Sequence, residues 1–164
     1  MKITLRDASV EDEGLLLEIY SSTRAKEMAL VPWSDPQKEA FVKMQFQAQD
    51  ADYHKRYPQA DYKVIMREGE PIGRIYIHRD TDRINILDVT ILPKYRNTGI
   101  GTNLIQTLLA EAAQSGKSVR IYVETFNRSL GLFERLGFSK IEEAGVNYLL
   151  EWRPPKLEYL EHPA

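Results

Sequence analysis

The stretch from Ile84 to Ala113 constrains this chain most, because a strand, a glycine loop and a helix follow one another there without a spacer. Residues 84–92 are mostly apolar and β-branched, which is typical of a buried central strand. Pro93 closes this strand, because proline has no N–H group to give to a strand ladder. Apolar residues then recur at helical spacing from Leu104 up to Gly116, which predicts a helix.

The loop between this strand and this helix is suited to an anion. The first amide groups of a helix have no partners within it, and the helix dipole adds positive charge there. Gly99 and Gly101 would let a phosphate approach the backbone without meeting a Cβ atom, and Arg96 supplies a positive charge. A plain capping turn would also use two glycines, so the loop by itself leaves both interpretations open.

Two common nucleotide motifs do not fit this loop. A P-loop has Lys and Ser or Thr directly after its last glycine, whereas Thr102 and Asn103 follow Gly101 here. A dinucleotide fingerprint has a third glycine or an alanine where this chain has Leu104.

The order Arg96-x-x-Gly99-x-Gly101 after a strand resembles the coenzyme A motif of the GNAT superfamily of N-acetyltransferases. Residues 127–138, from Asn127 to Phe138, resemble the asparagine-to-Gly-Phe segment that closes the core of that family. The resemblance implies an α/β (α+β) fold of GNAT type, with a mixed, mostly antiparallel central sheet of about six to seven strands and helices on both faces.

The length of 164 residues fits a single GNAT domain spanning residues 1–164. The resemblance divides this domain into acceptor-side helices (1–61), an acetyl-CoA core (62–138), a C-terminal hairpin (139–153) and a tail (154–164).

Local patterns predict the elements. A short strand over 2–6 precedes a helix that ends near residue 30, whose expected apolar face is Val10, Leu15, Leu16, Ile19 and Tyr20. Asp35 is expected to cap a second helix that continues to about Arg56. Short connections predict antiparallel strands over 62–67, 71–79 and 83–92, with a bulge or a close backbone approach at Gly73. A parallel strand over 119–124, a short helix capped by Asn127, and strands over 138–141 and 146–152 follow.

The coenzyme contacts are implied by the resemblance. The strand segment Val89, Thr90 and Ile91 is expected to bind pantetheine, and Asn127 to contact the coenzyme. Phe133 stands where the family usually has a tyrosine. The pyrophosphate is expected at the loop that Arg96 precedes, which consists of Asn97, Thr98, Gly99, Ile100, Gly101 and Thr102.

The resemblance does not supply a general acid or a general base in this sequence. Phe133 has no proton to give to the departing thiolate, and the glutamate base of some histone-acetylating members aligns with Asn85. The carboxylates nearest the expected cleft are Asp88 and Glu124, which are the catalytic candidates. Alternatively, Asp88 pairs with Arg74 or with backbone, and Glu124 is a solvated strand end.

The second helix offers candidates for an acceptor pocket. Its polar and aromatic residues, with one aromatic residue just before it, could line such a pocket: Trp33, Gln45, Gln49 and Tyr53. An amphipathic surface helix explains the same pattern.

Composition limits the partners. A net charge of −2 gives no basic field for nucleic acid, and the absence of cysteine with only three histidines predicts no metal site. No apolar run is long enough for a signal peptide or a membrane span, so we expect a cytoplasmic protein without a membrane partner.

The sequence therefore predicts an acetyl-CoA-dependent N-acetyltransferase, with acetyl-CoA as cosubstrate and a primary amine, of a small molecule, as acceptor. Two alternatives stay open: a protein N-terminal or lysine acetyltransferase, and a non-catalytic coenzyme A binding or sensing module. A homodimer, with Trp152 and the tail against a second copy, also stays open.

Overall fold

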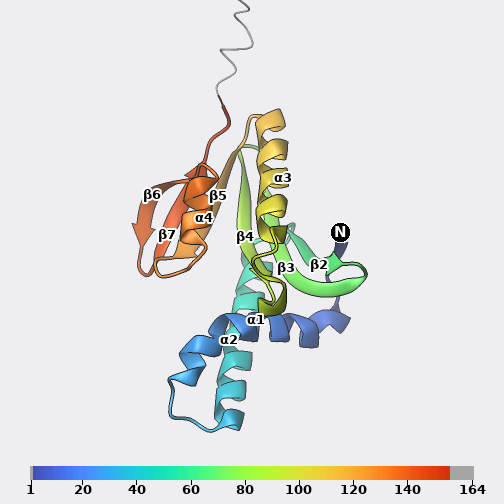
Figure 1. Cartoon of the computed structure of the whole chain (residues 1–164), viewed down its shortest axis with the longest axis vertical. Helices are drawn as coiled ribbons and strands as arrows, with labels where there is room; N and C mark the ends of the chain where they lie inside the picture. The colour runs from blue at the N-terminus through green and yellow to red at the C-terminus, as the bar shows by residue number, and fades with distance from the viewer. Residues whose placement is uncertain (1, 156–164) are drawn as a thin grey trace, which may run out of the picture. The chain divides into compact units, whose positions relative to one another are not determined.

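The computed structural model describes residues 2–155, and these residues form four α-helices and seven strands (Figure 1). Most of the predicted tail, residues 156–164, lies outside the described residues. The elements in chain order are β1 (Ile3–Asp7), the 3₁₀ turn η1 (Val10–Asp12), α1 (Glu13–Ala29), α2 (Asp35–Arg56), β2 (Asp61–Arg67), β3 (Glu70–Arg79), β4 (Arg83–Ile91), the 3₁₀ turn η2 (Pro93–Tyr95), α3 (Ile100–Ser115), β5 (Ser118–Glu124), α4 (Leu130–Arg135), β6 (Ser139–Ala144) and β7 (Asn147–Trp152).

The strands form a seven-stranded sheet of order β1-β2-β3-β4-β5-β7-β6. Strand β4 pairs with β5 in parallel, as expected for strands joined by a crossover helix. The pairs β1–β2, β2–β3, β5–β7 and β6–β7 are antiparallel. The predicted fold class, a mixed and mostly antiparallel sheet combined with helices, is therefore confirmed.

The described residues divide into two compact units. The first takes its residues from Met1–His78 and Asp88–Gly101, and the second from Arg79–Leu87 and Thr102–Ala164. Strand β4 and helix α3 each run from one unit into the other. The boundaries predicted for a single domain stay a prediction.

In the first unit, helices α1 and α2 bury apolar residues against β2. Leu16, Ile19 and Tyr20 recur at helical spacing on α1 and are buried with Val42 and Phe46 of α2. The prediction that Val10 shares this face is wrong, because its side chain is 94% exposed. Val10 begins the 3₁₀ turn η1, whose tighter winding breaks the phase of the α-helix that follows.

In the second unit, helix α3 and strand β5 supply much of the core. Ile105, Leu108 and Ala112 are buried on α3. Strand β5 alternates, so that Val119, Ile121 and Val123 are buried. Tyr122 points to the other face and is 58% exposed, so it lies outside this core.

The start of α2 is capped differently from the prediction. Ser34, not Asp35, is the N-cap residue, and its hydroxyl accepts a hydrogen bond from the Gln37 backbone N–H. The Gln37 side chain accepts one in return from the Ser34 backbone N–H. This reciprocal capping box satisfies two amides at once, and Asp35 then occupies the first turn.

Asp12 joins strand β1 to the start of α1. Its carboxylate accepts two hydrogen bonds from the Arg6 guanidinium, at 2.8 and 2.9 Å, and a third from the Ser9 backbone N–H at 2.8 Å. The Arg6 hydrogen bonds, followed by the Ser9 amide, lower the pKa of Asp12 to about 2 from its ordinary value of 3.8. The carboxylate therefore stays ionised over most of the acid range.

We expect Asp12→Asn to lower the free energy of unfolding by about 1–2 kcal/mol at pH 7, because the Arg6 guanidinium and the Ser9 amide lose an ionised partner. Since the folded pKa is depressed, the stabilisation is complete above pH 4 and disappears as the pH falls through about 2. Urea titrations at pH 7 and pH 2 measure the difference between the two proteins. An equal difference at both pH values would contradict this, and Asp52→Asn, at an exposed helical pair, should change stability less.

Candidate functional site

Arg96 ties the glycine loop to the end of β4. Its Nε–H donates a hydrogen bond to the Ile91 carbonyl oxygen at 2.8 Å, across the 3₁₀ turn Pro93–Tyr95. The segment expected to bind pantetheine therefore ends where a cationic side chain folds back on it. The positive charge of Arg96, at the start of the loop, is therefore fixed relative to the end of β4.

Two residues of the loop adopt left-handed backbone conformations. Asn97 has φ of 62° and Gly99 has φ of 83°. Asparagine and glycine are the residues that tolerate this region best, so the sequence suits the loop. The Thr98 hydroxyl donates to the Tyr95 carbonyl oxygen at 2.7 Å, and buried Ile100 begins α3. The loop is thus held from both sides.

Gly101 lies in the first turn of α3, with open space where a side chain would be. A Cβ atom at Gly101 would meet no protein atom within 4 Å. Packing therefore does not require glycine here, although glycine weakens a helix by about 1 kcal/mol relative to alanine. The first amides of α3 are suited to an anion. Binding of the coenzyme pyrophosphate at this loop stays a prediction.

Gly73 brings strand β3 unusually close to β4. A Cβ atom on Gly73 would overlap the Thr90 carbonyl oxygen, and the β2–β3 register shifts beside it. The predicted bulge or close approach at Gly73 is confirmed. This glycine consequently shapes the part of β4 that is expected to bind pantetheine.

Asp88 is paired with a buried arginine. The Nε–H group of Arg74 donates to Asp88 Oδ2 at 2.6 Å, and the Thr90 hydroxyl donates to the same oxygen at 3.0 Å. The Arg74 residue is 1% exposed, whereas the Asp88 side chain is 22% exposed. The pairing that the sequence left open for Asp88 is present, and the carboxylate still reaches the surface.

Of the four acceptor candidates, Gln49 contacts this pair and Tyr53 contacts the nearby Tyr76. Gln49 Oε1 accepts a hydrogen bond from Arg74 at 2.8 Å, and the Tyr53 ring packs edge-on against Tyr76 with 5.9 Å between centroids. Gln45 lies one helical turn before Gln49 on the same side of α2. Trp33 instead packs against Phe41 near the start of α2.

Sequence reasoning named Arg74 only as an alternative partner of Asp88, and it missed Tyr76. The signal was present, because Arg74 is a charged residue within an otherwise apolar stretch of β3. Only a partner from another element explains such a residue in a buried strand.

Burial keeps the Tyr53 hydroxyl protonated. Desolvation is the largest cause that raises the pKa of Tyr53, and the charge of Asp88 adds to it. Tyr53 therefore remains a neutral group that can donate or accept a hydrogen bond at neutral pH.

The candidates of the second unit are held by local contacts. Asn127 Oδ1 accepts hydrogen bonds from the backbone N–H and the hydroxyl of Ser129, at 2.8 and 2.7 Å. Ser129, not Asn127 as predicted, is the N-cap residue of α4. Phe133 is 2% exposed and packs edge-on against Phe138. Contacts of the coenzyme with Asn127 and Phe133, and a catalytic role for the partly buried Glu124, stay predictions.

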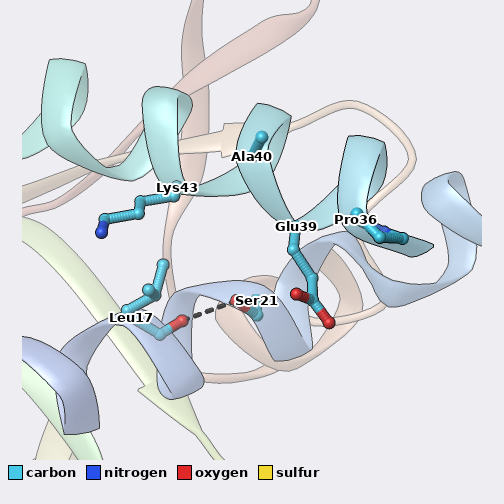
Figure 2. Close-up of a pocket in the computed structure, with 6 residues that line it drawn as sticks. All are labelled: Leu17, Ser21, Pro36, Glu39, Ala40 and Lys43. Atoms are coloured by element: carbon cyan, nitrogen blue, oxygen red, sulfur yellow. Dashed lines mark hydrogen bonds between the residues drawn. The ribbon is translucent and has the colours of Figure 1, made fainter. Parts of the chain in front are cut away.

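The first unit contains two hollows. One hollow, between α1 and α2, has a volume of about 430 Å³. Figure 2 shows the residues that line it: Leu17, Ser21, Pro36, Glu39, Ala40 and Lys43. A hollow of about 410 Å³ is lined by Leu15, Glu18, Pro71, Leu92, Pro93, Lys94 and Tyr95. Neither hollow is lined by a predicted site residue. The second is lined by Leu92, which directly follows Ile91 in the chain.

Residues 2–155 contain no cluster of three or more His, Asp or Glu side chains that could hold a metal ion. Within the same range, every helix is too short or too polar to cross a membrane.

Residues 22–138 match the family model described as the acetyltransferase (GNAT) family. This match covers most of the chain. The chain belongs to the GNAT family.

A curated relative from the yeast Schizosaccharomyces pombe, an uncharacterized N-acetyltransferase, is 40% identical over 47 residues. That stretch is 29% of this chain and 32% of the relative, so the chain matches about a third of the length of that protein.

Solved structures share the GNAT fold over nearly the whole chain. The PaiA N-acetyltransferase from Thermoplasma acidophilum, solved in complex with coenzyme A, has a TM-score of 0.69 at 18% identity and covers 93% of this chain and 99% of its own. The ribosomal-protein-S18-alanine N-acetyltransferase from Escherichia coli has a TM-score of 0.63 at 15% identity, covering 93% of this chain and 94% of its own. At these identities the likeness shows the fold.

We expect Gly73→Ala to destabilise this GNAT protein by about 1–3 kcal/mol, because the new methyl group overlaps the Thr90 carbonyl oxygen and must push β3 and β4 apart. Gly14→Ala in α1 is the matched control, since a Cβ atom there meets nothing within 4 Å. The control should be neutral or stabilising by up to about 1 kcal/mol. Chemical denaturation of both variants measures the effect, and similar stabilities would contradict the close approach.

Proposed function

We propose that this protein transfers an acetyl group from acetyl-CoA to a primary amine of a small molecule. Family membership supports acetyl transfer, and the loop after β4 supports the coenzyme. The cytoplasmic location and the homodimer stay predictions from the sequence.

The observation that carries the proposal is the junction of β4, the glycine loop and α3. Left-handed Asn97 and Gly99 turn the chain, Gly101 leaves space beside the first turn of α3, and Arg96 folds back on the strand. Such a junction presents backbone amides and the positive end of a helix dipole to an anion. The pyrophosphate of acetyl-CoA is an anion of that kind, and the PaiA protein of similar fold was solved with coenzyme A.

Acetyl-CoA supplies the acetyl group as a thioester. The neutral amine nitrogen attacks the thioester carbonyl carbon, a C–N bond replaces the C–S bond, and coenzyme A leaves as a thiolate. The amine loses one proton and the thiolate takes one up, so no net proton is consumed. Phe133 cannot provide that proton, because its side chain is a buried phenyl ring. A thiolate is a good leaving group, so the reaction does not require a tyrosine there.

Calorimetric titration with acetyl-CoA, with NAD and ATP as comparison ligands, tests the coenzyme half of the proposal. We expect acetyl-CoA alone to bind tightly, and an amine panel to release thiol. Absence of acetyl-CoA binding would refute the proposed function, and binding without turnover on any amine would favour a sensing module.

We expect Gly101→Leu to weaken acetyl-CoA binding at least about tenfold, equivalent to about 1.4 kcal/mol, because the new side chain fills the space beside the helix amides. Its folded stability should not fall, because a Cβ atom there meets no protein atom within 4 Å and leucine favours helix. Gly14→Leu is the control and should leave binding unchanged. Unaltered binding in Gly101→Leu would show that the glycine loop is only a helix cap.

A further inference from the structure

We propose that Arg120 and Arg153 form a binding site for a phosphate group, and that the buried carboxylate of Glu151 holds their guanidinium groups in place. All residues of this site belong to the second unit. The site shares no residue with the glycine loop, and it does not depend on the proposed acetyl transfer.

The register of the strands brings these side chains to one face of the sheet. Arg120 of β5 lies directly opposite Glu151 of β7, and Ser139 of β6 lies opposite Glu151 on its other side. Residues that pair directly point their side chains to the same face. Arg153 follows β7 by one residue, and its hydrogen bond to Glu151 shows that it reaches this face too.

Glu151 anchors both arginines through its two carboxylate oxygens. The Nε–H group of Arg120 donates to Oε2, and the Nε–H group of Arg153 donates to Oε1, each at 2.6 Å. Since both reach the oxygens of one carboxylate, the two guanidinium groups lie close together. The Glu151 side chain is only 3% exposed, so it fixes the arginines from below without reaching a ligand.

This cluster holds one more positive charge than the burial of Glu151 requires. A buried carboxylate is compensated by one cation. Burial, the largest single cause, raises the pKa of Glu151, but the hydrogen bonds from Arg153 and Arg120 outweigh it and keep the carboxyl ionised at neutral pH. Among the ion pairs of residues 2–155, neither arginine has a second carboxylate partner. A net positive charge therefore remains at this face.

The groups of the cluster that are still available are hydrogen-bond donors. Within the described part of the chain, the terminal N–H groups of neither arginine make a hydrogen bond. The side chain of Arg120 is 26% exposed and that of Arg153 is 79% exposed, so both can be reached from solvent. Ser139 adds a hydroxyl beside Glu151, and Ser118 adds one two residues before Arg120 on the same face of β5.

A phosphate group matches this donor set better than a carboxylate. One guanidinium fork binds both oxygens of a carboxylate, so such a ligand would use only one of the two arginines. A phosphate monoester presents three acceptor oxygens and a charge of about −1.5 to −2 at pH 7, which two forks and two hydroxyls can share. Inorganic phosphate and a phosphate monoester have this chemistry in common.

Calorimetric titration with inorganic phosphate tests the site, with saturating acetyl-CoA present to occupy the glycine loop. We expect phosphate to bind at least about tenfold more tightly than acetate. Arg153→Gln should weaken phosphate binding at least about tenfold, and it should fold because Glu151 keeps Arg120 as its partner. Arg135→Gln, the same charge change on α4, is the control and should alter binding less than about twofold.

Equal binding of phosphate and acetate, or unchanged phosphate binding in Arg153→Gln, would overturn the inference. The dependence on Arg153 identifies the site whether or not acetyl-CoA binds, so failure of the proposed function would not be mistaken for failure of this site.

Side-chain NMR of the unmodified protein tests the same site without any substitution. Phosphate should shift the Nε–H signals of Arg120 and Arg153 and leave that of Arg135 in place. Shifts confined to the amides of residues 97–102 would contradict the proposal, because phosphate would then bind only at the glycine loop.

Arg153→Lys separates the planar fork from the charge, because lysine keeps the charge and loses the fork. We expect phosphate binding to weaken at least about threefold in this variant, and unchanged affinity would contradict recognition by two forks. Glycerol 3-phosphate as a second probe distinguishes the two sources of the group. Tighter binding than inorganic phosphate would support a phosphate monoester as the ligand, and weaker binding would support free phosphate.

Discussion

The buried guanidinium of Arg74 is the group on which the arrangement of the first unit depends. An unpaired charge in an apolar interior is prohibitively costly, and removing one partner of a buried ion pair typically costs about 3–5 kcal/mol. Asp88 provides the counter-charge, and Gln49 and Tyr76 accept further hydrogen bonds. Strand β4 and helix α2 must therefore both approach β3 at this point. The polar site and the packing of the unit are consequences of one buried cation.

The glycine loop obeys a different constraint, which is local backbone geometry. Asn97 and Gly99 adopt positive φ values that few other residues tolerate, and Gly101 gives up helix stability with no packing reason. Residues that lower stability without improving packing are typical of functional positions. The Arg96 hydrogen bond to Ile91 then joins this loop to β4, the strand that also carries Asp88, the partner of Arg74. Strand β4 thus links the loop to the Asp88 carboxylate.

The second unit is stabilised by its own buried carboxylate. Glu151 of β7 accepts hydrogen bonds from Arg120 of β5 and from Arg153, each at 2.6 Å, although its side chain is almost completely buried. Burial by itself would raise the pKa of Glu151, but the two guanidinium groups outweigh it and hold the pKa below the ordinary value. Phe133 and Phe138 close the core nearby along the chain. A phenyl ring at position 133 therefore serves packing.

The sequence by itself determined the local order of this protein. Strand β4, the loop and α3 were predictable because apolar periodicity, Pro93 and two glycines are short-range signals, and the parallel β4–β5 pair follows from a crossover connection. Tertiary structure decided the rest. Val10 and Tyr122 lie outside the core because a 3₁₀ turn and strand alternation set their phase. The contacts among Gln49, Arg74 and Asp88 join α2, β3 and β4, so no local pattern encodes them; they form because a charge buried in β3 must find its partners on other elements.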